Sequence, residues 1–479
     1  MSEHVGYIVE VKQLREHSNA DRMRVATFFG NDTCVDLNVK IGDKGIYFPT
    51  DLQLSVEFCE QNNLVRKKDE NGNNIGGYMD PSKRNVSTIK LRGEKSDGLY
   101  LPIECLAYTG IDLNSLSVGT PIDVVNAHEI CCKYIPRGKV RHSNKEGNRT
   151  RKKKVPVAPL FTEHADTEQL AYNLGEFHPG DLLEITLKMH GTSQRTAYVP
   201  VLKGFKKTLW ERICGKPGQP IYDWGYVSGT RRTVLDNFDG GFYGSNDFRE
   251  PHSKFFEGKL HKGEEVYYEV VGFQTSGAPI MGSAANKKTA DKEFIKQYGD
   301  TTVFSYGCSP EGYKTMYGND DVGAFELPVA LPQSDFYVYR MTMTNEDGDV
   351  IEYTPEYMRY RCEQMGCKTV PVLAKAYVDE NSVEILWSAN PAAIDHAITS
   401  AESLGDGVRQ VAEYFYDGPD PIGKTHIREG VVVRIVNKPK FCAFKHKNFY
   451  FKALEGIVKA SAEAPDMEEA EEVLNETAE

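Results

Sequence analysis

The sequence predicts an α+β protein in which short strands, arranged mainly in antiparallel sheets, outnumber helices. The first 125 or so residues hold short β-branched and aromatic runs separated by Asn, Asp and Gly, at 7–11, 24–29 and 44–49. From residue 161 onward strand and helix patterns alternate irregularly, with strands expected at 184–188, 265–271, 335–339 and 430–436 and a helix start at 354–360. A chain of 479 residues is too long for one ordinary core, so we expect two domains, with three as the alternative.

The N-terminal region predicts a small barrel, because its strands are short and show no helical spacing. Residues 17–22 (HSNADR) and 91–98 (LRGEKSDG) are similar to sequences in the OB domains that bind tRNA beside some aminoacyl-tRNA synthetases. This resemblance implies an OB-type β-barrel over residues 1–128, with Arg92 and Lys95 as RNA-binding residues. The alternative is a barrel that serves only packing or acts as a lid.

Charge is unevenly distributed along the chain. The net charge is -12, yet residues 133–154 hold ten Lys or Arg against one Glu, and residues 462–479 hold eight acidic residues and no basic ones. Because the local field governs the approach of a polyanion, the total charge does not exclude RNA. We therefore expect a basic linker at 129–158, with Arg151, Lys152 and Lys153 on the phosphate backbone, and an acidic tail at 459–479. The alternative for the linker is that it is merely solvated.

The composition indicates a soluble globular protein, with 40% hydrophobic residues and a mean hydropathy of -0.48. No run approaches the eighteen or so apolar residues of a membrane span, and the N-terminus has no signal-peptide pattern. The ten cysteines show no Cys-x-x-Cys spacing, which argues against a zinc site and a disulfide framework. We expect a cytoplasmic protein with reduced thiols, no membrane association and no obligate protein partner.

Three separated segments suggest a covalent lysine–nucleotide site. Lys188 precedes Gly191 by three residues, Glu429 opens an apolar strand, and Lys445 and Lys447 begin sixteen residues after that glutamate. In this order Lys188 would attack the α-phosphate of a nucleotide, and the two later lysines would hold that phosphate. An amine attacks only when neutral, and neighbouring cations or a bound metal favour that form while they stabilise the developing charge. The alternative is that the three segments are unrelated.

The second half of the chain resembles the RNA ligase 2 branch of the covalent nucleotidyltransferases. The resemblance covers roughly residues 160–455 and includes the Lys-x-His-Gly-Thr sequence at 188–192, where DNA ligases and capping enzymes usually have Asp in place of His. It implies an adenylyltransferase domain at 159–458 with ATP-grasp-like antiparallel sheets and helices. Two positions depart from the branch: Leu187 stands where it has an acidic residue, and Arg340 stands where it has Asp.

The resemblance also implies a role for each site residue. Lys188 would be adenylylated, His190 and Gly191 would lie near the sugar and phosphate, and Glu269 would bind the ribose hydroxyls. The remaining assignments are Arg232 on the ribose or a phosphate, Tyr339 stacked on adenine, Glu429 acting through a divalent metal, and Lys445 and Lys447 on the α-phosphate. The alternatives are a solvated hairpin for Arg232, a solvent-facing position for Glu269 and simple core packing for Tyr339.

The activity implied is ATP-dependent RNA ligation, with Mg²⁺ or Mn²⁺, of a 3′-hydroxyl to a 5′-phosphate end through lysyl-AMP and RNA-adenylate, in RNA repair. One alternative is another enzyme of the superfamily, a capping guanylyltransferase or a DNA ligase, against which His190 and the N-terminal position of the OB-like region argue. The other is a non-catalytic RNA-binding protein. The presence of Lys188, Glu269, Glu429 and both C-terminal lysines speaks against it.

Overall fold

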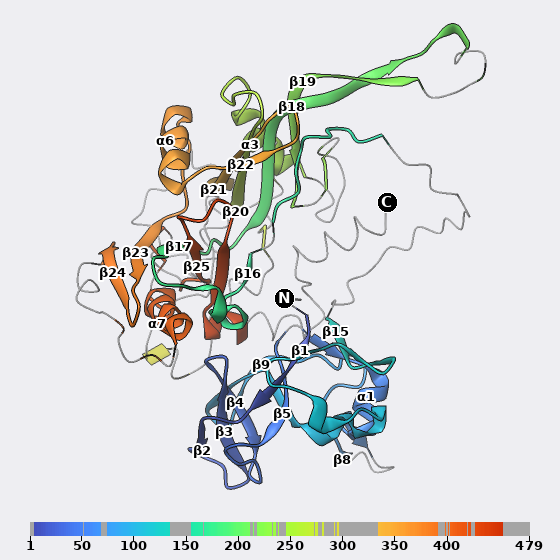
Figure 1. Cartoon of the computed structure of the whole chain (residues 1–479), viewed down its shortest axis with the longest axis vertical. Coiled ribbons are helices and arrows are strands. Elements are labelled where there is room, and N and C mark those ends of the chain that lie inside the picture. The colour runs from blue at the N-terminus through green and yellow to red at the C-terminus, as the bar shows by residue number, and fades with distance from the viewer. Residues whose placement is uncertain are drawn as a thin grey trace, which may run out of the picture. The chain divides into compact units, whose positions relative to one another are not determined.

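The computed structural model confirms an α+β chain with many antiparallel strands and few helices, drawn in Figure 1. The structure describes residues 4–50, 52–68, 74–134, 155–165, 167–210, 218–231, 246–272, 334–390, 403–418 and 427–453, with the shorter pieces 214, 233–235, 238, 274–275, 280–281, 292, 295–296, 398, 401 and 420–422. These residues form two compact units. The first comprises the described residues of 1–136, 168–176 and 449–461, and the second comprises those of 137–167 and 177–448.

The first unit is built almost entirely from short strands. Its larger sheets have the orders β11-β5-β1-β12 and β2-β3-β4, and strands β6 to β10 and β13 to β15 pair two by two. The bounds are β1 (Gly6–Glu10), β2 (Leu14–Glu16), β3 (Met23–Phe28), β4 (Asn31–Asp36), β5 (Lys44–Phe48), β6 (Leu52–Leu54), β7 (Lys67–Lys68), β8 (Asn74–Gly76), β9 (Thr88–Leu91), β10 (Glu94–Asp97), β11 (Leu99–Pro102), β12 (Pro121–Ile122), β13 (Val124–Val125), β14 (His128–Glu129), β15 (Cys131–Lys133), β16 (Glu168–Gln169) and helix α1 (Val56–Gln61). These sheets do not close into one hydrogen-bonded barrel within the described residues, so an OB barrel is not confirmed.

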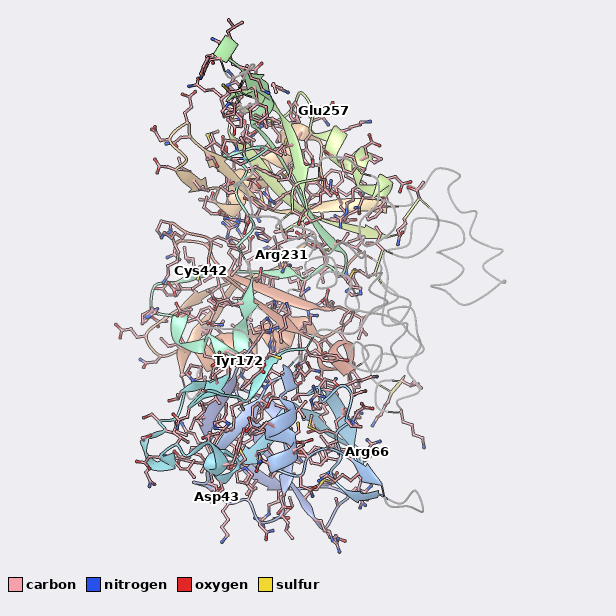
Figure 2. The ribbon with its side chains drawn as sticks, turned by 90° about the vertical axis from the view of Figure 1, so that its right-hand side faces the viewer. Asp43, Arg66, Tyr172, Arg231, Glu257 and Cys442 are labelled. Atoms are coloured by element: carbon pink, nitrogen blue, oxygen red, sulfur yellow. The ribbon has the colours of Figure 1, made fainter. Side chains whose placement is uncertain are left out.

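Aromatic side chains from separate segments pack together in this unit. Tyr172, which Figure 2 labels, stacks on Tyr7 with ring centroids 5.4 Å apart and meets Phe29 edge-on at the same distance. A second, larger cluster of aliphatic side chains packs around Ile8, Phe48 and the buried face of α1. The strands expected at 7–11, 24–29 and 44–49 are confirmed as β1, β3 and β5.

The second unit contains two antiparallel sheets. Sheet A has the order β19-β18-β20-β21-β22, and in sheet B the strands β26, β25, β17, β23 and β24 follow one another. Their bounds are β17 (Leu182–Leu187), β18 (Thr192–Lys206), β19 (Gln219–Gly229), β20 (Glu264–Gly272), β21 (Ser334–Thr344), β22 (Val350–Glu352), β23 (Val372–Val378), β24 (Val383–Ser388), β25 (Gly430–Ile435) and β26 (Ala443–Lys447). The helices are α3 (Glu250–Phe255), α6 (Pro355–Met365) and α7 (Leu404–Tyr416), and α7 packs on sheet B.

Local sequence explains where the longer helices begin and end. Thr354 caps α6 by accepting the Tyr357 N–H on its hydroxyl, with Pro355 in the first turn, and Gly366 ends the helix in the left-handed conformation. Ser403 caps α7 in the same way through the Asp406 N–H. The predicted helix start at 354–360 is therefore confirmed. Among the described residues no helix is long and apolar enough to cross a membrane.

The predicted basic linker lies mostly outside the described residues, but both of its ends are described. Residues up to Lys133 still form strands, since β15 pairs with β6. At the other end the Val157 carbonyl accepts the Leu202 N–H of β18 at 2.7 Å, and Ala158 and Phe161 are buried against sheet A. Residues 157–161 are therefore packed against the protein. They occupy the edge of β18 beyond Ala197, where β18 no longer pairs with β20.

Candidate active site

The strand register of sheet B brings the three separated sequence segments together. Strand β17 ends at Leu187, and the Lys188 N–H donates to the Gly430 carbonyl at 3.0 Å. Gly430 begins β25 directly after Glu429 and is paired with Lys447 of β26. Side chains from the ends of three neighbouring strands therefore converge, where residues 188–191 lead from sheet B into sheet A.

Ionic contacts within this cluster are short and shielded from solvent. Lys188 Nζ lies 2.7 Å from Glu429 Oε1, and Lys447 Nζ lies 3.4 Å from the same oxygen. His190 Nδ1 is 3.3 Å from Glu429 Oε2. The Glu429 side chain is 2% exposed, whereas those of Lys188 and Lys447 are 20% and 18% exposed. Part of each lysine side chain is thus open to solvent or a ligand, whereas the carboxylate is covered by its partners.

Glu429 stays ionised in this setting. Burial alone would raise its pKa, but the positive charges of Lys188 and Lys447, with His190, hold the pKa well below its usual range. One carboxylate faces two ammonium groups, which leaves an excess positive charge that an anionic ligand can neutralise. Lys445 lies two residues before Lys447 on β26, hence on the same face of that strand.

A glycine and a buried arginine shape the segment that follows the lysine. A Cβ at Gly191 would lie 2.3 Å from the Val270 carbonyl oxygen and 2.9 Å from Glu269 Cγ, so the backbone can approach β20 only because this residue is glycine. Glu269 is half-buried and lies opposite Ser193 in the register of β18 and β20. The close approach of Gly191 to β20 therefore places Glu269, the residue predicted to bind the ribose hydroxyls, beside the turn at His190 and Gly191.

Arg249 holds the first residues of β18 in place through hydrogen bonds. Its guanidinium is completely buried and donates to the Ser193 carbonyl at 2.9 Å and to the Thr192 hydroxyl at 2.7 Å. It is a positioning residue that sequence reasoning missed. An arginine at the start of α3 carries no motif or spacing that would have indicated its burial.

Tyr339 lies on the same face of sheet A as Ser193. The two hydroxyls share a hydrogen bond at 3.0 Å, and the ring is half-buried. The His164 ring lies 5.3 Å from that of Tyr339 between centroids. Tyr339 is thus not fully enclosed in a core, and it leaves part of its ring at the surface of the site.

His164 is a second residue that the sequence did not indicate. The Arg340 Nη1 group donates to His164 Nδ1 at 3.2 Å, and because a guanidinium can only donate, Nδ1 must lack a proton. Burial, with the positive charges of Arg231 and Arg340, lowers the pKa of His164 well below its ordinary value. The imidazole beside Tyr339 is therefore neutral and carries its proton on Nε2.

The Arg340 guanidinium forms a buried ion pair with Glu352. It donates to Glu352 at 2.9 Å, and Arg434 of sheet B donates to the same carboxylate at 3.1 Å. Glu352 thereby links the two sheets through charge-assisted hydrogen bonds. This explains how Arg340 is accommodated where the RNA ligase 2 branch has Asp, while Leu187, the other departure, is buried in sheet B.

Other predicted residues lie elsewhere or outside the described part of the chain. Arg92 is exposed in the two-residue turn between β9 and β10, where both Arg92 and Gly93 have positive φ, as a type I′ hairpin requires. Lys95 Nζ lies 5.0 Å from the ring centroid of Phe449 and 5.1 Å from that of Tyr450. The residues outside the described part are Arg232, Arg151, Lys152 and Lys153.

The donor set suits a metal bound together with phosphates better than an all-protein metal site. Within the described residues no group of three or more His, Cys, Asp or Glu could hold an ion. Glu429 offers a carboxylate beside Lys188 and Lys447. Mg²⁺ is commonly bound through one or two carboxylates plus substrate phosphates and water, so a single carboxylate in a phosphate site fits that ion.

Comparison with known proteins gives a likeness in structure alone. No family model and no curated protein sequence matches this chain. A solved structure of Naegleria gruberi RNA ligase with PPi superposes with a TM-score of 0.50 at 15% identity, over 94% of this chain and 98% of that one. A ligand-free mutant of the same ligase gives a TM-score of 0.50 at 16% identity, over 94% and 97%. This chain shares that fold. The likeness spans both units, in agreement with the α+β class predicted from the sequence.

Proposed function

We propose that this protein is an ATP-dependent RNA ligase that joins a 3′-hydroxyl to a 5′-phosphate end. The observation that carries the proposal is the buried cluster of Lys188, Glu429 and Lys447, assembled from three separated segments in the order expected of a lysine nucleotidyltransferase. The solved structures that share the fold are described as RNA ligases, one of them with PPi, the by-product of adenylylation by ATP.

In the first step Lys188, as the neutral amine after it has lost its ammonium proton to solvent, would attack the α-phosphate of ATP, forming the lysyl-AMP bond as the bond to pyrophosphate breaks. Lys447, and Lys445 on the same face of β26, would oppose the charge that develops on the phosphoryl oxygens. Preorganised donors of this kind commonly contribute on the order of 10²–10³ in rate each. Tyr339 and Glu269 would orient the base and ribose, so that the phosphorus lies in line with the amine.

Glu429 would orient the lysine rather than remove its proton. Its carboxylate lies 2.7 Å from Lys188 Nζ, but its lowered pKa makes it a weak base. Mg²⁺ or Mn²⁺, when bound through Glu429 and the phosphates, would supply further charge neutralisation. Without a ligand, the carboxylate pairs with both lysines.

Two further steps would complete ligation. AMP would pass from Lys188 to the 5′-phosphate of RNA as a 5′–5′ pyrophosphate, and a 3′-hydroxyl would then displace AMP. We propose that residues 1–128 form an OB-type domain that docks the RNA, with Arg92 and Lys95 and the basic residues of the 129–158 linker as contacts. Residues 159–458 would form the adenylyltransferase domain and 459–479 the acidic tail, in a cytoplasmic protein of RNA repair.

Labelling with ATP that is radioactive at the α-phosphate tests the first step. The intact protein with Mg²⁺ or Mn²⁺ should gain a covalent label, GTP should give none, and Lys188→Ala should abolish it. A matched control is Lys375→Ala, which removes a half-exposed lysine of sheet B that pairs with Glu356 and should keep the label. A Lys188→Ala protein that is still labelled would assign the nucleophile elsewhere. A wild-type protein that stays unlabelled would refute adenylylation.

A further inference from the structure

Sheet A continues as a two-stranded arm beyond the rest of the sheet. Strand β18 pairs with β20 only as far as Ala197, while its pairing with β19 runs on to Lys206. Figure 1 shows these two strands extending past the other elements of the sheet. We call residues 198–210 and 218–226 the arm. An isolated pair of strands is only marginally stable in water. At the base of the arm residues 156–161 supply contacts, since the Val157 carbonyl accepts the Leu202 N–H and the Pro156 carbonyl accepts the Tyr222 hydroxyl.

The strand register collects aromatic side chains on one face of the arm. Residues directly opposite in an antiparallel pair share a face, and Tyr198 faces Tyr226 while Pro200 faces Trp224 and Leu202 faces Tyr222. A bulge after Leu202 shifts the alternation by one residue and returns Phe205 to this face, opposite Pro220. The aromatic residues of this face are Tyr198, Phe205, Tyr222, Trp224 and Tyr226.

These rings form a continuous surface at the base of the arm and become exposed toward its end. Tyr198 stacks on Tyr226 with centroids 4.7 Å apart and lies 5.7 Å from Trp224. Phe205 is 43% exposed, and beyond the end of β18 Trp210 is 69% exposed. Large exposed rings at the end of a projecting hairpin contribute nothing to a core, and such apolar exposure commonly marks a binding surface.

The charge of the arm is opposite to that of the whole protein. Lys203, Lys206 and Lys207 are exposed, and Asp223 is the one acidic residue among the described residues of the arm, which gives a net charge of +2. The whole chain carries -12. From a neighbouring loop, Lys262 Nζ lies 4.9 Å from the Trp224 ring centroid. Lysine is depleted at the core of protein–protein interfaces. Exposed lysines beside exposed aromatic rings therefore favour, over a protein partner, a ligand that carries both negative charges and flat rings that can stack.

We propose that the arm is a docking site for single-stranded RNA. Bases would stack on Phe205 and Trp210, and Lys206 and Lys207 would neutralise phosphates, which is how proteins hold single strands without reading their sequence. Strand β18 begins at Thr192, directly after the turn that follows Lys188, and its fifteen residues span roughly 45 Å. The arm would therefore hold RNA well away from the joined ends. The inference rests on the proposed function for its ligand, but the chemistry of the arm is separate from that of the lysine cluster.

Direct binding to a fluorescein-labelled single-stranded oligoribonucleotide tests this proposal in the full-length protein. The double variant Phe205→Ala/Trp210→Ala should bind roughly 5- to 150-fold more weakly for each stacked ring that is lost. The double variant Lys206→Ala/Lys207→Ala should reduce the slope of log Kd against log salt by about 1.4, the value for two released phosphate contacts on a single strand. A matched aromatic control is Trp387→Ala, since Trp387 is 45% exposed on β24 and should not affect binding.

Two further comparisons make the outcome decisive. The same RNA annealed into a blunt duplex has no free base faces, so the aromatic variant should lose little affinity for it, and an equal loss for both forms overturns stacking. Unchanged affinity and unchanged salt slope in both arm variants overturn RNA docking altogether. Covalent labelling of the arm variants by ATP should equal that of the wild type. If the wild type is not labelled, the ligase proposal fails while the RNA affinities still decide the role of the arm.

Discussion

Replacing Glu429 by glutamine should destabilise the second unit, because the substitution removes the negative charge that compensates two ammonium groups. Glu429 Oε1 is 2.7 Å from Lys188 Nζ and 3.4 Å from Lys447 Nζ, and its side chain is 2% exposed. Removing one partner of a buried pair usually costs about 3–5 kcal/mol. Both lysines retain some contact with solvent, so we expect the lower end, about 3 kcal/mol, which for a unit of this size corresponds to a fall in Tm of roughly 4–5 °C.

The pH dependence gives this prediction a sign. The folded-state pKa of Glu429 lies below the ordinary carboxyl value of 4.5, so its contribution is fully present above that pH and is lost as the pH falls through the folded pKa. Glu429→Gln should therefore lower the free energy of unfolding at pH 7, measured by urea denaturation. The difference between variant and wild type should shrink progressively as the pH falls from about 4.5 toward the much lower folded-state pKa, because over this range the unfolded chain takes up a proton on Glu429 that the folded protein does not.

A second buried carboxylate provides the control. Glu264 is completely buried and accepts two hydrogen bonds from Arg361, each of 2.8 Å. Glu264→Gln should also lose stability but keep covalent labelling by ATP at temperatures where it remains folded, whereas Glu429→Gln should lose both. If Glu429→Gln is as stable as the wild type at pH 7, the carboxylate does not hold two buried charges and the argument from the cluster is wrong.

Two other substitutions test separate parts of the second unit. Gly191→Ala places a Cβ 2.3 Å from the Val270 carbonyl oxygen and should displace the turn by enough to slow labelling by ATP about 10²-fold, whereas Gly175→Ala, where nothing lies within 4 Å, should label normally. Burial lowers the pKa of His252 to about 4, so stability should fall by about 3 kcal/mol as the pH drops from about 6.5 to 4. His252→Gln should lose that part of the pH dependence, and a denaturation series identical to the wild type would contradict the assignment.

Local patterns were enough to predict much of the fold. Alternating or continuous runs of β-branched residues marked β17, β20, β21 and β25, and the Thr354–Pro355 pair marked the start of α6, because strands and caps depend on residues close in sequence. Closure of the N-terminal strands into a barrel depends instead on which edges pair over long separations. No short-range pattern specifies that pairing, and the described sheets remain separate.

The same division applies to the candidate site. The order of Lys188, Glu429 and Lys447 along the chain indicated a common site, and their convergence in the structure supports that hypothesis. Arg249 and His164 could not be found in this way, since their positions follow from packing against Thr192 and beside Tyr339 rather than from a motif. A buried arginine that donates to backbone carbonyls has the same sequence signature as an exposed one.

Register explains why such distant segments can form one cluster. Gly430 accepts from the Lys188 N–H and pairs with Lys447, so both lysines are placed by the same residue that follows Glu429. Side chains alternate along a strand, so a slip of one residue between β25 and β26 would turn Lys445 and Lys447 to the opposite face, toward α7. The apolar residue of β26 opposes that slip, because Phe444, which is paired with Val433, is 4% exposed and would have to exchange places with Lys445. The hydrophobic pattern of sheet B thus selects the register that sets the charges of the site.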